Sequence, residues 1–444
     1  MRYILFGLTA FLTAVLALPT ELKEPGQLAL VLGEDDFEDY IDSWFEREAT
    51  LRTKSSTFQP RSGCSIRVNG DLGQPQPVFI RNNTYMQPNF SSGFITLNTG
   101  EQVVVACSGP GRTIRHPNIT STTIQVATAT CQRDAYIAGA GWLNGYGAFR
   151  QLTCSSHPTH EAYYTNNRCW GLNFIVRVGY IVNGIFHPLY SSCFNPQRLE
   201  VLYVWYDQGP ENAYYQTGVD RPNWEAGQFF PGVDVNSMYT QEQQKATVAQ
   251  YVGQNLANAY ITDTQFLSRG HLAARTDFVF ASGQRASFYF INSAPQWQPF
   301  NAGNWNTLEQ SLRIRIAAAG YKTVIYTGTW GVTQLRDQHN RLIDIFLNRN
   351  RNQIPVPLYM YKVVYYPDSQ IGTAFVSINN PYYSHGEARD LTFCTDRCRN
   401  NISFNWLGWQ PDRIDIGYSF CCTVDDFRRT VPHLPAFTTL GLLT

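Results

Sequence analysis

The segment FLSRGHLAARTDF at residues 266–278 places a histidine just after an arginine and a glycine. His271 can act as a general base near neutral pH, because imidazole titrates close to that range. Arg269 carries a permanent charge, and its planar guanidinium group suits phosphate oxygens. Gly270 between them permits a tight turn or one with a positive φ angle. The segment therefore offers a base and a cation side by side.

Three polar residues that could complete such a site follow in order. Asn292 ends an apolar run, Asn301 comes nine residues later, and Glu309 comes eight residues after that. Amide and carboxylate oxygens are ligands for a hard divalent cation. Each residue also has an ordinary interpretation, because an asparagine before a helix is often an N-cap and a helical glutamate often pairs with a base at i+4, here Arg313. Taken singly, none of them indicates a reaction.

The elements that must position these residues form a hairpin followed by a helix. The pattern predicts a turn at SRGH, a strand at ASFYFIN (residues 286–292), a loop at SAPQWQPFNAG, and a helix over residues 304–320 that ends at Gly320. Such a layout can gather a base, a cation and oxygen ligands around one metal ion.

The rest of the second half predicts a mixed α+β domain over residues 196–444 with a mainly antiparallel sheet. Aromatic and β-branched runs such as RLEVLYVWYDQG, KTVIYTGTW and LYMYKVVYY are typical of strands. A helix is predicted to start at Thr240 as N-cap. Residues 18–195 predict a disulfide-stapled β domain, because short strand-like runs alternate with turn residues.

The first residues, MRYILFGLTAFLTAVLALPTE, are typical of a signal peptide over residues 1–17; a signal anchor is the alternative. Residues 20–60 are acidic and polar, and EDDFEDYIDSWFERE predicts a short helix. No other run is long and apolar enough to span a bilayer. We therefore expect secretion to an extracellular compartment, of which a digestive lumen is one example, and no membrane association after cleavage.

In such a compartment the ten cysteines are expected to form disulfides within two groups. Cys421 and Cys422 are adjacent, so each should bond back to Cys394 or Cys398 rather than to the other. A four-thiolate zinc site is the alternative for this second group. The first group comprises Cys64, Cys107, Cys131, Cys154, Cys169 and Cys193.

Other surface features are also visible in the sequence. A metal site at CSSHPTH, with Cys154, His157 and His160, is a weak alternative, because histidines in such loops usually face solvent. Four N-x-S/T sequons predict glycosylation on the surface. They begin at Asn82, Asn89, Asn118 and Asn401.

Three linked motifs resemble those of the DNA/RNA non-specific endonuclease family, whose active site is a β-β-α metal (His-Me finger) motif. They are Ser-Arg-Gly-His at 268–271, Asn-x-x-Pro-Gln at 292–296 and Asn-x-Gly-x-Trp-x-x-Leu-Glu at 301–309. Their order and internal spacing agree with the family pattern. The resemblance covers residues 196–444, and the cysteine-rich features resemble the secreted arthropod branch, which includes insect double-stranded ribonucleases and crustacean duplex-preferring nucleases.

The resemblance implies a role for each residue. His271 would activate water as general base, Asn301 would bind a single Mg²⁺ ion, for which Mn²⁺ is a substitute, and Glu309 would hold the water shell of the ion. Asn292 would support the site by hydrogen bonding. Arg269 would stabilise the phosphorane charge, and Arg221, in VDRPNW, resembles a phosphate-contacting arginine although an extra proline interrupts that match. Ser268 departs from the aspartate that the family usually has there.

The resemblance implies a secreted, Mg²⁺-dependent endonuclease that cuts double-stranded RNA and DNA to 5′-phosphorylated oligonucleotides, with no obligate protein partner. Formal net charge is zero and only 15% of residues are charged, so any basic surface for nucleic acid must be local. The alternatives are a secreted nucleic-acid-binding or recognition protein with an inert nuclease core, and a small-molecule phosphodiesterase.

Overall fold

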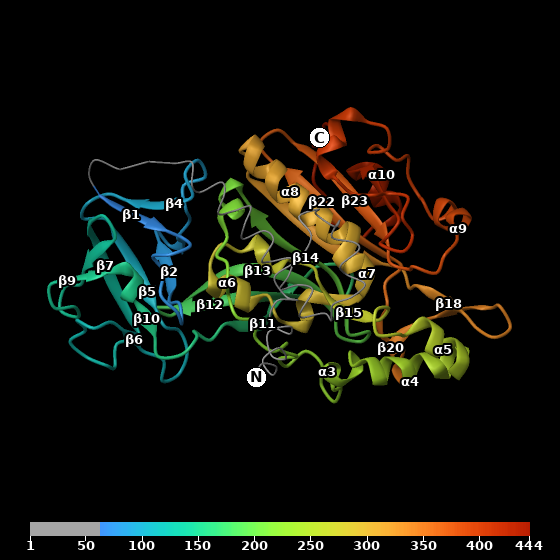
Figure 1. Cartoon of the computed structure of the whole chain (residues 1–444), viewed down its shortest axis with the longest axis horizontal. Helices are drawn as coiled ribbons and strands as arrows, with labels where there is room; N and C mark the ends of the chain where they lie inside the picture. The colour runs from blue at the N-terminus through green and yellow to red at the C-terminus, as the bar shows by residue number, and fades with distance from the viewer. Residues whose placement is uncertain (1–62) are drawn as a thin grey trace, which may run out of the picture.

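The computed structural model describes residues 63–444, so the predicted signal peptide and the acidic stretch at 20–60 lie outside the described residues. Figure 1 shows a small β region beside a larger region in which helices pack on a broad sheet. Within residues 63–444, no helix combines the length and hydropathy that a membrane span requires.

The small N-terminal region is built from short antiparallel strands around its own core. Its six-stranded sheet has the order β3-β2-β5-β7-β8-β9, and β1-β4 and β6-β10 form separate pairs. Disulfides Cys64–Cys131 and Cys107–Cys154 cross-link it. The strands are β1 (Cys64–Arg67), β2 (Val78–Arg81), β3 (Thr84–Tyr85), β4 (Phe94–Leu97), β5 (Gln102–Ala106), β6 (Ile114–Arg115), β7 (Val126–Arg133), β8 (Tyr136–Ala138), β9 (Tyr146–Ala148) and β10 (Thr153–Cys154).

The larger region contains an eight-stranded sheet with the order β11-β12-β13-β14-β17-β22-β23-β24, in which every neighbouring pair is antiparallel. This confirms the predicted α+β class and the mainly antiparallel sheet. The strands are β11 (Glu161–Arg168), β12 (Phe174–Val182), β13 (Ile185–Asn195), β14 (Glu200–Gln208), β17 (Thr323–Trp330), β22 (Tyr359–Tyr366), β23 (Ile371–Ile378) and β24 (Ser419–Thr423).

The domain boundary predicted at residue 195 falls inside this sheet. Strands β12 and β13 pair with each other, and β13 pairs with β14 across the predicted boundary. The reason is that β11 to β13 bury apolar residues such as Val178 and Tyr190 in the core of the larger region. The third disulfide, Cys169–Cys193, therefore staples the main sheet rather than the N-terminal β region. We place the boundary near residue 160.

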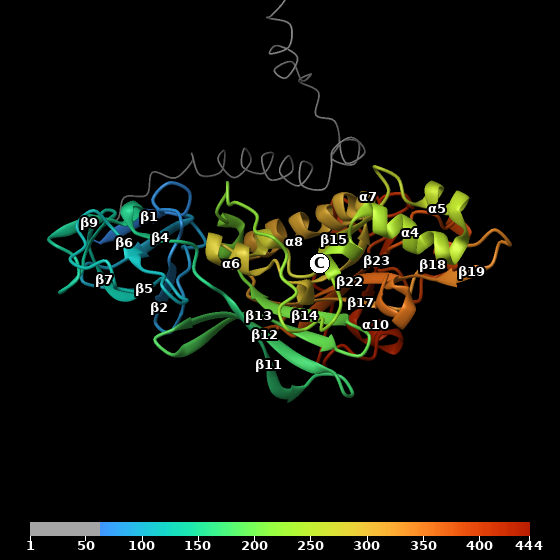
Figure 2. The ribbon, with the colours of Figure 1, turned by 90° about the horizontal axis from the view of Figure 1, so that it is seen from below.

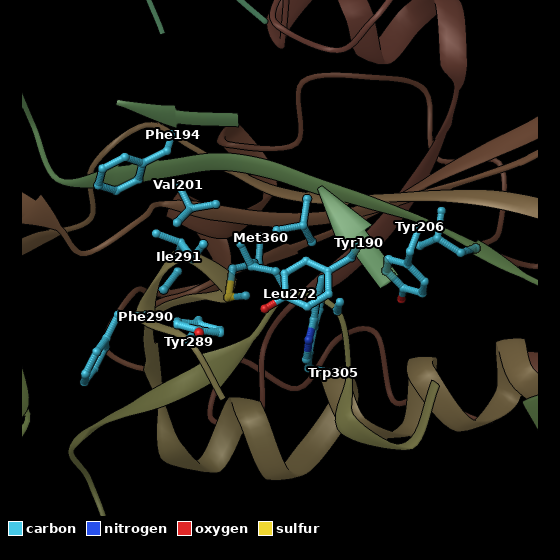
Figure 3. Packing of buried hydrophobic residues seen from close by; sticks show 14 of the residues in the cluster. Tyr190, Phe194, Val201, Tyr206, Leu272, Tyr289, Phe290, Ile291, Trp305 and Met360 are labelled. Carbon is cyan, nitrogen blue, oxygen red and sulfur yellow. The ribbon is translucent and has the colours of Figure 1, made fainter. Parts of the chain in front are cut away.

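Both faces of the main sheet are covered. One face packs against α8 (Asn306–Ala319), which contributes Leu308, Leu312 and Ile316 to the large core. Figure 3 shows Leu272, Ile291 and Met360 packed together within this core. The other face packs against α10 (Val424–Thr430) and the C-terminal segment. Because its middle strands are buried on both faces, they appear as nearly continuous apolar runs.

The predicted helix boundaries at Thr240 and Gly320 are confirmed. The Thr240 side chain accepts a hydrogen bond from the Gln243 amide at the start of α4, and Gly320 ends α8 with a positive φ of 71°. The remaining helices are α3 (Val235–Met238), α4 (Gln241–Val252), α5 (Gln254–Tyr260), α6 (Ala281–Ala286), α7 (Gln298–Phe300) and α9 (His385–Asp390). Figure 2 places α4 and α5 beyond β15, near one end of the molecule.

The last two disulfides are Cys394–Cys422 and Cys398–Cys421. They confirm that each of the adjacent cysteines bonds back to the earlier pair, and they leave no thiolate for the alternative zinc site. Short hairpins and 3₁₀ turns complete the region. They are β18 (Gln334–Arg336), β19 (Leu342–Asp344), β20 (Phe346–Asn348), β21 (Gln353–Pro355), η2 (Pro210–Tyr214), η3 (Arg275–Asp277), η6 (Arg349–Arg351) and η7 (Ile402–Leu407).

A buried histidine makes the far face of the sheet sensitive to acid. His433 stacks on Tyr203, and its Nε2 lies 2.7 Å from the Tyr361 hydroxyl. Burial lowers the pKa of His433 to about 4, so the folded state binds this proton less readily than the unfolded state does. Its contribution to stability is present above pH 6.5 and is lost as the pH falls toward 4, by about 3 kcal/mol in all. We expect a His433→Phe variant to show a smaller fall in unfolding free energy between pH 7 and 4 than the wild type. An identical fall in both proteins would contradict this assignment.

Candidate active site

The site is built on a two-stranded hairpin of β15 (Leu267–His271) and β16 (Ser293–Trp297), followed by α8. His271 pairs with Ser293, and Arg269 pairs with Pro295. Because side chains alternate along a strand, Arg269 and His271 project from the same face. The structure thus has the strand–strand–helix order that was predicted, with the base and the cation side by side.

Two details of that prediction were wrong. SRGH lies in a strand rather than a turn, and the predicted strand ASFYFIN forms the end of α6 and the turn η4 (Phe290–Asn292). The strand instead begins at Ser293, in the segment predicted as a loop. β propensity alone does not choose the strand, because pairing with β15 decides which residues become extended.

Gly270 is required for close packing rather than for a positive φ angle. A Cβ atom at this position would lie 2.1 Å from the side-chain Oε1 of Gln296. Ser268, on the same face of β15 as Gly270, is fully buried, and its hydroxyl donates to the Gln296 carbonyl at 3.0 Å. Ser268 therefore ties the two strands together and projects away from the face that carries His271.

His271 lies against an aromatic wall. Its ring is 4.6 Å from that of Trp224 and 4.9 Å from that of Phe288, and its Nε2 is 3.3 Å from the Ser287 hydroxyl. Burial, together with the charges of the nearby Arg221 and Arg275, lowers the pKa of His271 to about 3. The imidazole is therefore neutral at physiological pH and able to accept a proton.

Asn292 holds the segment behind His271. Its carboxamide is fully buried; Oδ1 accepts from the Ala273 amide at 2.8 Å, and Nδ2 donates to the carbonyls of Ala273 at 3.0 Å and Ser287 at 2.9 Å. These bonds join Ala273, two residues after His271, to Ser287, whose hydroxyl contacts the His271 ring. Asn292 is thus placed to support the site.

Arg269 and Arg221 bring positive charge to this face. The Arg269 guanidinium lies 5.2 Å from the ring centroid of Tyr239 and 6.0 Å from that of Phe290. Arg221 lies on the segment that leads to Trp224, and its charge acts on His271. Sequence reasoning missed Arg275, whose only signal is its position four residues after His271.

Asn301 and Glu309 lie within residues 301–319, the helical arm formed by η5 (Asn301–Trp305) and α8 after β16. Asn301 begins the wide π-helical turn η5 and is half-buried. Among the described residues, its carboxamide has no hydrogen-bond partner. Glu309 lies in the first turn of α8. Burial raises the pKa of Glu309 to about 7, with Lys362 and Arg313 opposing and Asp277 adding to the rise.

The donor set suits a hard cation that keeps most of its waters. The Glu309 Oε1 atom is buried with no hydrogen-bond partner, so a bound water or ion shell would satisfy it. Amide and carboxylate oxygens of this kind fit Mg²⁺, which dehydrates reluctantly. In the part of the chain that the structure describes, the one dense cluster of metal-ligand side chains is Asp396, Cys398 and Cys421, and its sulfur atoms are in a disulfide.

A buried charge network behind the site was also missed. Asp277 accepts from the Tyr206 hydroxyl at 2.5 Å, from Gln208 at 3.0 Å and from Arg313 at 2.9 Å. The predicted i+4 partner of Glu309, Arg313, is thus engaged by Asp277. Lys362 adjoins this network, because its Nζ lies 3.4 Å from the Tyr206 hydroxyl. Its charge within the apolar strand YMYKVVYY is the sequence signal that could have indicated a buried network.

The weak metal alternative near His157 and His160 does not assemble. Cys154 is in a disulfide, and the ring of His160 contacts the Tyr289 hydroxyl at 3.1 Å and Glu225 at 3.7 Å. The sequons remain predictions of glycosylation. Asn82, Asn89 and Asn118 are exposed, whereas Asn401 is half-buried and its Nδ2 donates to the Arg397 carbonyl.

A sequence profile of the DNA/RNA non-specific endonuclease family matches residues 175–427, which is more than half of the chain. The chain belongs to this family. It is therefore an endonuclease, a phosphodiester hydrolase whose substrate is nucleic acid, and enzymes of this family typically depend on a metal ion. The matched range begins within β12, which agrees with the extension of the main sheet before residue 195.

Individual relatives of the endonuclease cover most of its length. A salivary endonuclease of Lutzomyia longipalpis is 24% identical over 372 residues, covering 82% of each chain. A salivary endonuclease of Culex quinquefasciatus is 28% identical over 383 residues, covering 83% of this chain and 89% of that protein. A crystal structure of the EndoG/EndoGI complex matches with a TM-score of 0.35 and 17% identity, over 58% of this chain and 89% of that one.

Proposed function

We propose that the protein is a secreted, sugar-non-specific endonuclease that uses Mg²⁺ to hydrolyse double-stranded RNA and DNA to 5′-phosphorylated oligonucleotides. The observation that carries the proposal is the hairpin face on which a neutral His271 lies beside Arg269. Five disulfides support secretion, since such bonds persist in oxidising compartments.

In this mechanism His271 accepts the proton of the attacking water. Trp224 and Phe288 pack around the ring and shield it from bulk water, which keeps it neutral until the proton arrives. Arg269 and Arg221 offset the negative charge that develops on the phosphate. Asn292 keeps the backbone behind His271 in place through its three hydrogen bonds.

Asn301 would bind the Mg²⁺ ion, and Glu309 would accept hydrogen bonds from its waters; Mn²⁺ is the expected substitute. When bound, the ion supplies positive charge to the phosphate and to the leaving oxygen. A neutral asparagine ligand leaves that charge nearly intact. Contacts directed at phosphate rather than at base edges would account for cleavage with little sequence preference.

The proposal is tested by incubating the pure protein with plasmid DNA and with long double-stranded RNA, each with Mg²⁺ and with excess EDTA. We expect both substrates to be shortened with Mg²⁺ and neither with EDTA. The ends of the products should accept no further 5′-phosphate from a polynucleotide kinase until a phosphatase has acted. Retention of both substrates without shortening would instead support a binding protein with an inert core. Turnover of a dinucleotide ester alone would indicate a small-molecule phosphodiesterase.

A further inference from the structure

A fully buried lysine lies between the two halves of the site. Lys362 is in the middle of β22 and is 1% exposed. Its strand neighbours Met360 and Val364, which share its face of the sheet, are both core residues. Transferring an ammonium group into such surroundings is unfavourable unless it is paired. The position of this charge therefore requires an explanation.

The contacts of the Lys362 ammonium group reach both halves of the site. Its Nζ lies 3.7 Å from Glu309 Oε1, on the helical arm, and 3.5 Å from the carbonyl of Leu272, the residue after His271. It donates to the Thr327 hydroxyl at 2.9 Å. One cation thus links the strand end that carries the base to the carboxylate on α8.

The neighbouring buried charges do not need Lys362. Asp277 is already paired with Arg313 at 2.9 Å, and Tyr206 lies between the two pairs, 2.5 Å from Asp277 and 3.4 Å from Lys362 Nζ. Glu309 is the carboxylate that Lys362 faces, and its Oε1 atom has no hydrogen-bond partner among the described residues. The carboxylate with which the Lys362 ammonium pairs is therefore Glu309.

We propose that Lys362 is a positioning residue, which holds the Glu309 carboxylate directed toward the waters of the metal ion. This inference rests on the proposed function, because it assigns Lys362 a role through Glu309. At 3.7 Å the ammonium attracts the carboxylate without a hydrogen bond, so the oxygen keeps its accepting capacity for a water molecule. An arginine or a closer lysine would occupy that capacity.

The test is a double-mutant cycle of Lys362→Met, Glu309→Gln and the double variant, read out without substrate. The unfolding temperature is measured against Mg²⁺ and Mn²⁺ concentration to obtain the midpoint of metal binding. We expect Lys362→Met to raise the metal midpoint by about tenfold or more, as for residues that orient metal-binding groups. The double variant should match Glu309→Gln alone, because the two residues act as one unit.

A matched control is Thr327→Val, which removes the hydrogen-bond partner of Lys362 at 2.9 Å but keeps the charge. We expect its metal midpoint to stay near that of the wild type. Three outcomes would each overturn the inference. They are additive effects in the cycle, an unchanged metal midpoint in Lys362→Met, and a metal midpoint in Thr327→Val as high as in Lys362→Met.

Lys362→Met alone leaves a buried carboxylate without its partner and can fail to fold. In that case the double variant, which carries no charge at either position, is compared with Glu309→Gln: equal midpoints support the inference, and unequal midpoints overturn it. A wild-type protein that binds metal with a coupled cycle but cuts no nucleic acid would refute the proposed function alone. A protein that cuts nucleic acid but gives an additive cycle would overturn this inference alone.

Discussion

Replacing His271 by alanine is expected to lower the rate of cleavage of plasmid DNA and double-stranded RNA by roughly 10²–10⁴-fold, the usual contribution of a positioned general base. The ring is neutral because burial lowers its pKa to about 3, and it lies on the same strand face as Arg269. Two other histidines are engaged elsewhere, since His160 contacts the Tyr289 hydroxyl and His433 lies on the far side of the sheet. Initial rates at saturating Mg²⁺ measure the effect.

The matched control is His339→Ala, because His339 is exposed on the hairpin between β18 and β19. This variant should cleave at the wild-type rate. Circular dichroism melts should show that His271→Ala remains folded, although loss of contacts with Trp224 and Phe288 lowers its unfolding temperature. Addition of free imidazole should restore part of the rate, since the space left by the ring can accept it. Full activity in His271→Ala would remove this residue from the mechanism.

Replacing Asn301 by alanine is expected to reduce the cleavage rate by at least roughly 10²-fold, because a bound ion that stabilises developing charge contributes several kcal/mol. The loss should shrink as the Mg²⁺ concentration rises, since the remaining oxygen groups still attract the ion. The unfolding temperature without metal should not change, because the Asn301 carboxamide makes no hydrogen bond to another described residue. Rates measured across a Mg²⁺ titration test the first two expectations, and a thermal melt in EDTA tests the third.

Asn304, on the same turn, provides the contrasting variant. Its buried Nδ2 donates to the carbonyls of Gln410 at 2.8 Å and Gly417 at 2.7 Å, and its Oδ1 accepts from the Gln410 amide at 2.8 Å. Asn304→Ala should therefore lower the unfolding free energy by about 2–3 kcal/mol while leaving the Mg²⁺ dependence of cleavage unchanged. If Asn301→Ala were destabilised instead and kept its Mg²⁺ dependence, Asn301 would be a structural residue rather than a metal ligand.

The helix ends and the disulfide groups could be predicted because they depend on local chemistry. The Thr240 hydroxyl and the positive φ of Gly320 are requirements of single residues. Likewise, adjacent cysteines such as Cys421 and Cys422 bond poorly to each other, so their partners had to lie elsewhere. The strands of the main sheet were equally visible, since aromatic and β-branched runs favour extended structure.

The domain boundary and the second strand of the site could not be predicted in this way. Strand β13 joins the main sheet because β14 offers it a hydrogen-bonding edge, and nothing within 185–195 shows which sheet it will join. Similarly, Phe290 has strong β propensity but lies in η4, whereas Pro295 is extended in β16 opposite Arg269. Pairing between distant segments decides such cases.

The sequence by itself determined which groups were available for chemistry: a histidine, an arginine, two asparagines and a glutamate in a fixed order, with spacing that matches a nuclease family. Only the tertiary structure decided the protonation and the neighbours of these groups. Burial keeps His271 neutral. Folding places Lys362, which comes ninety-one residues after His271 in the chain, beside Glu309. The physical reason is that pKa values and buried charge pairs depend on desolvation and on neighbours brought together by folding, which no local pattern encodes.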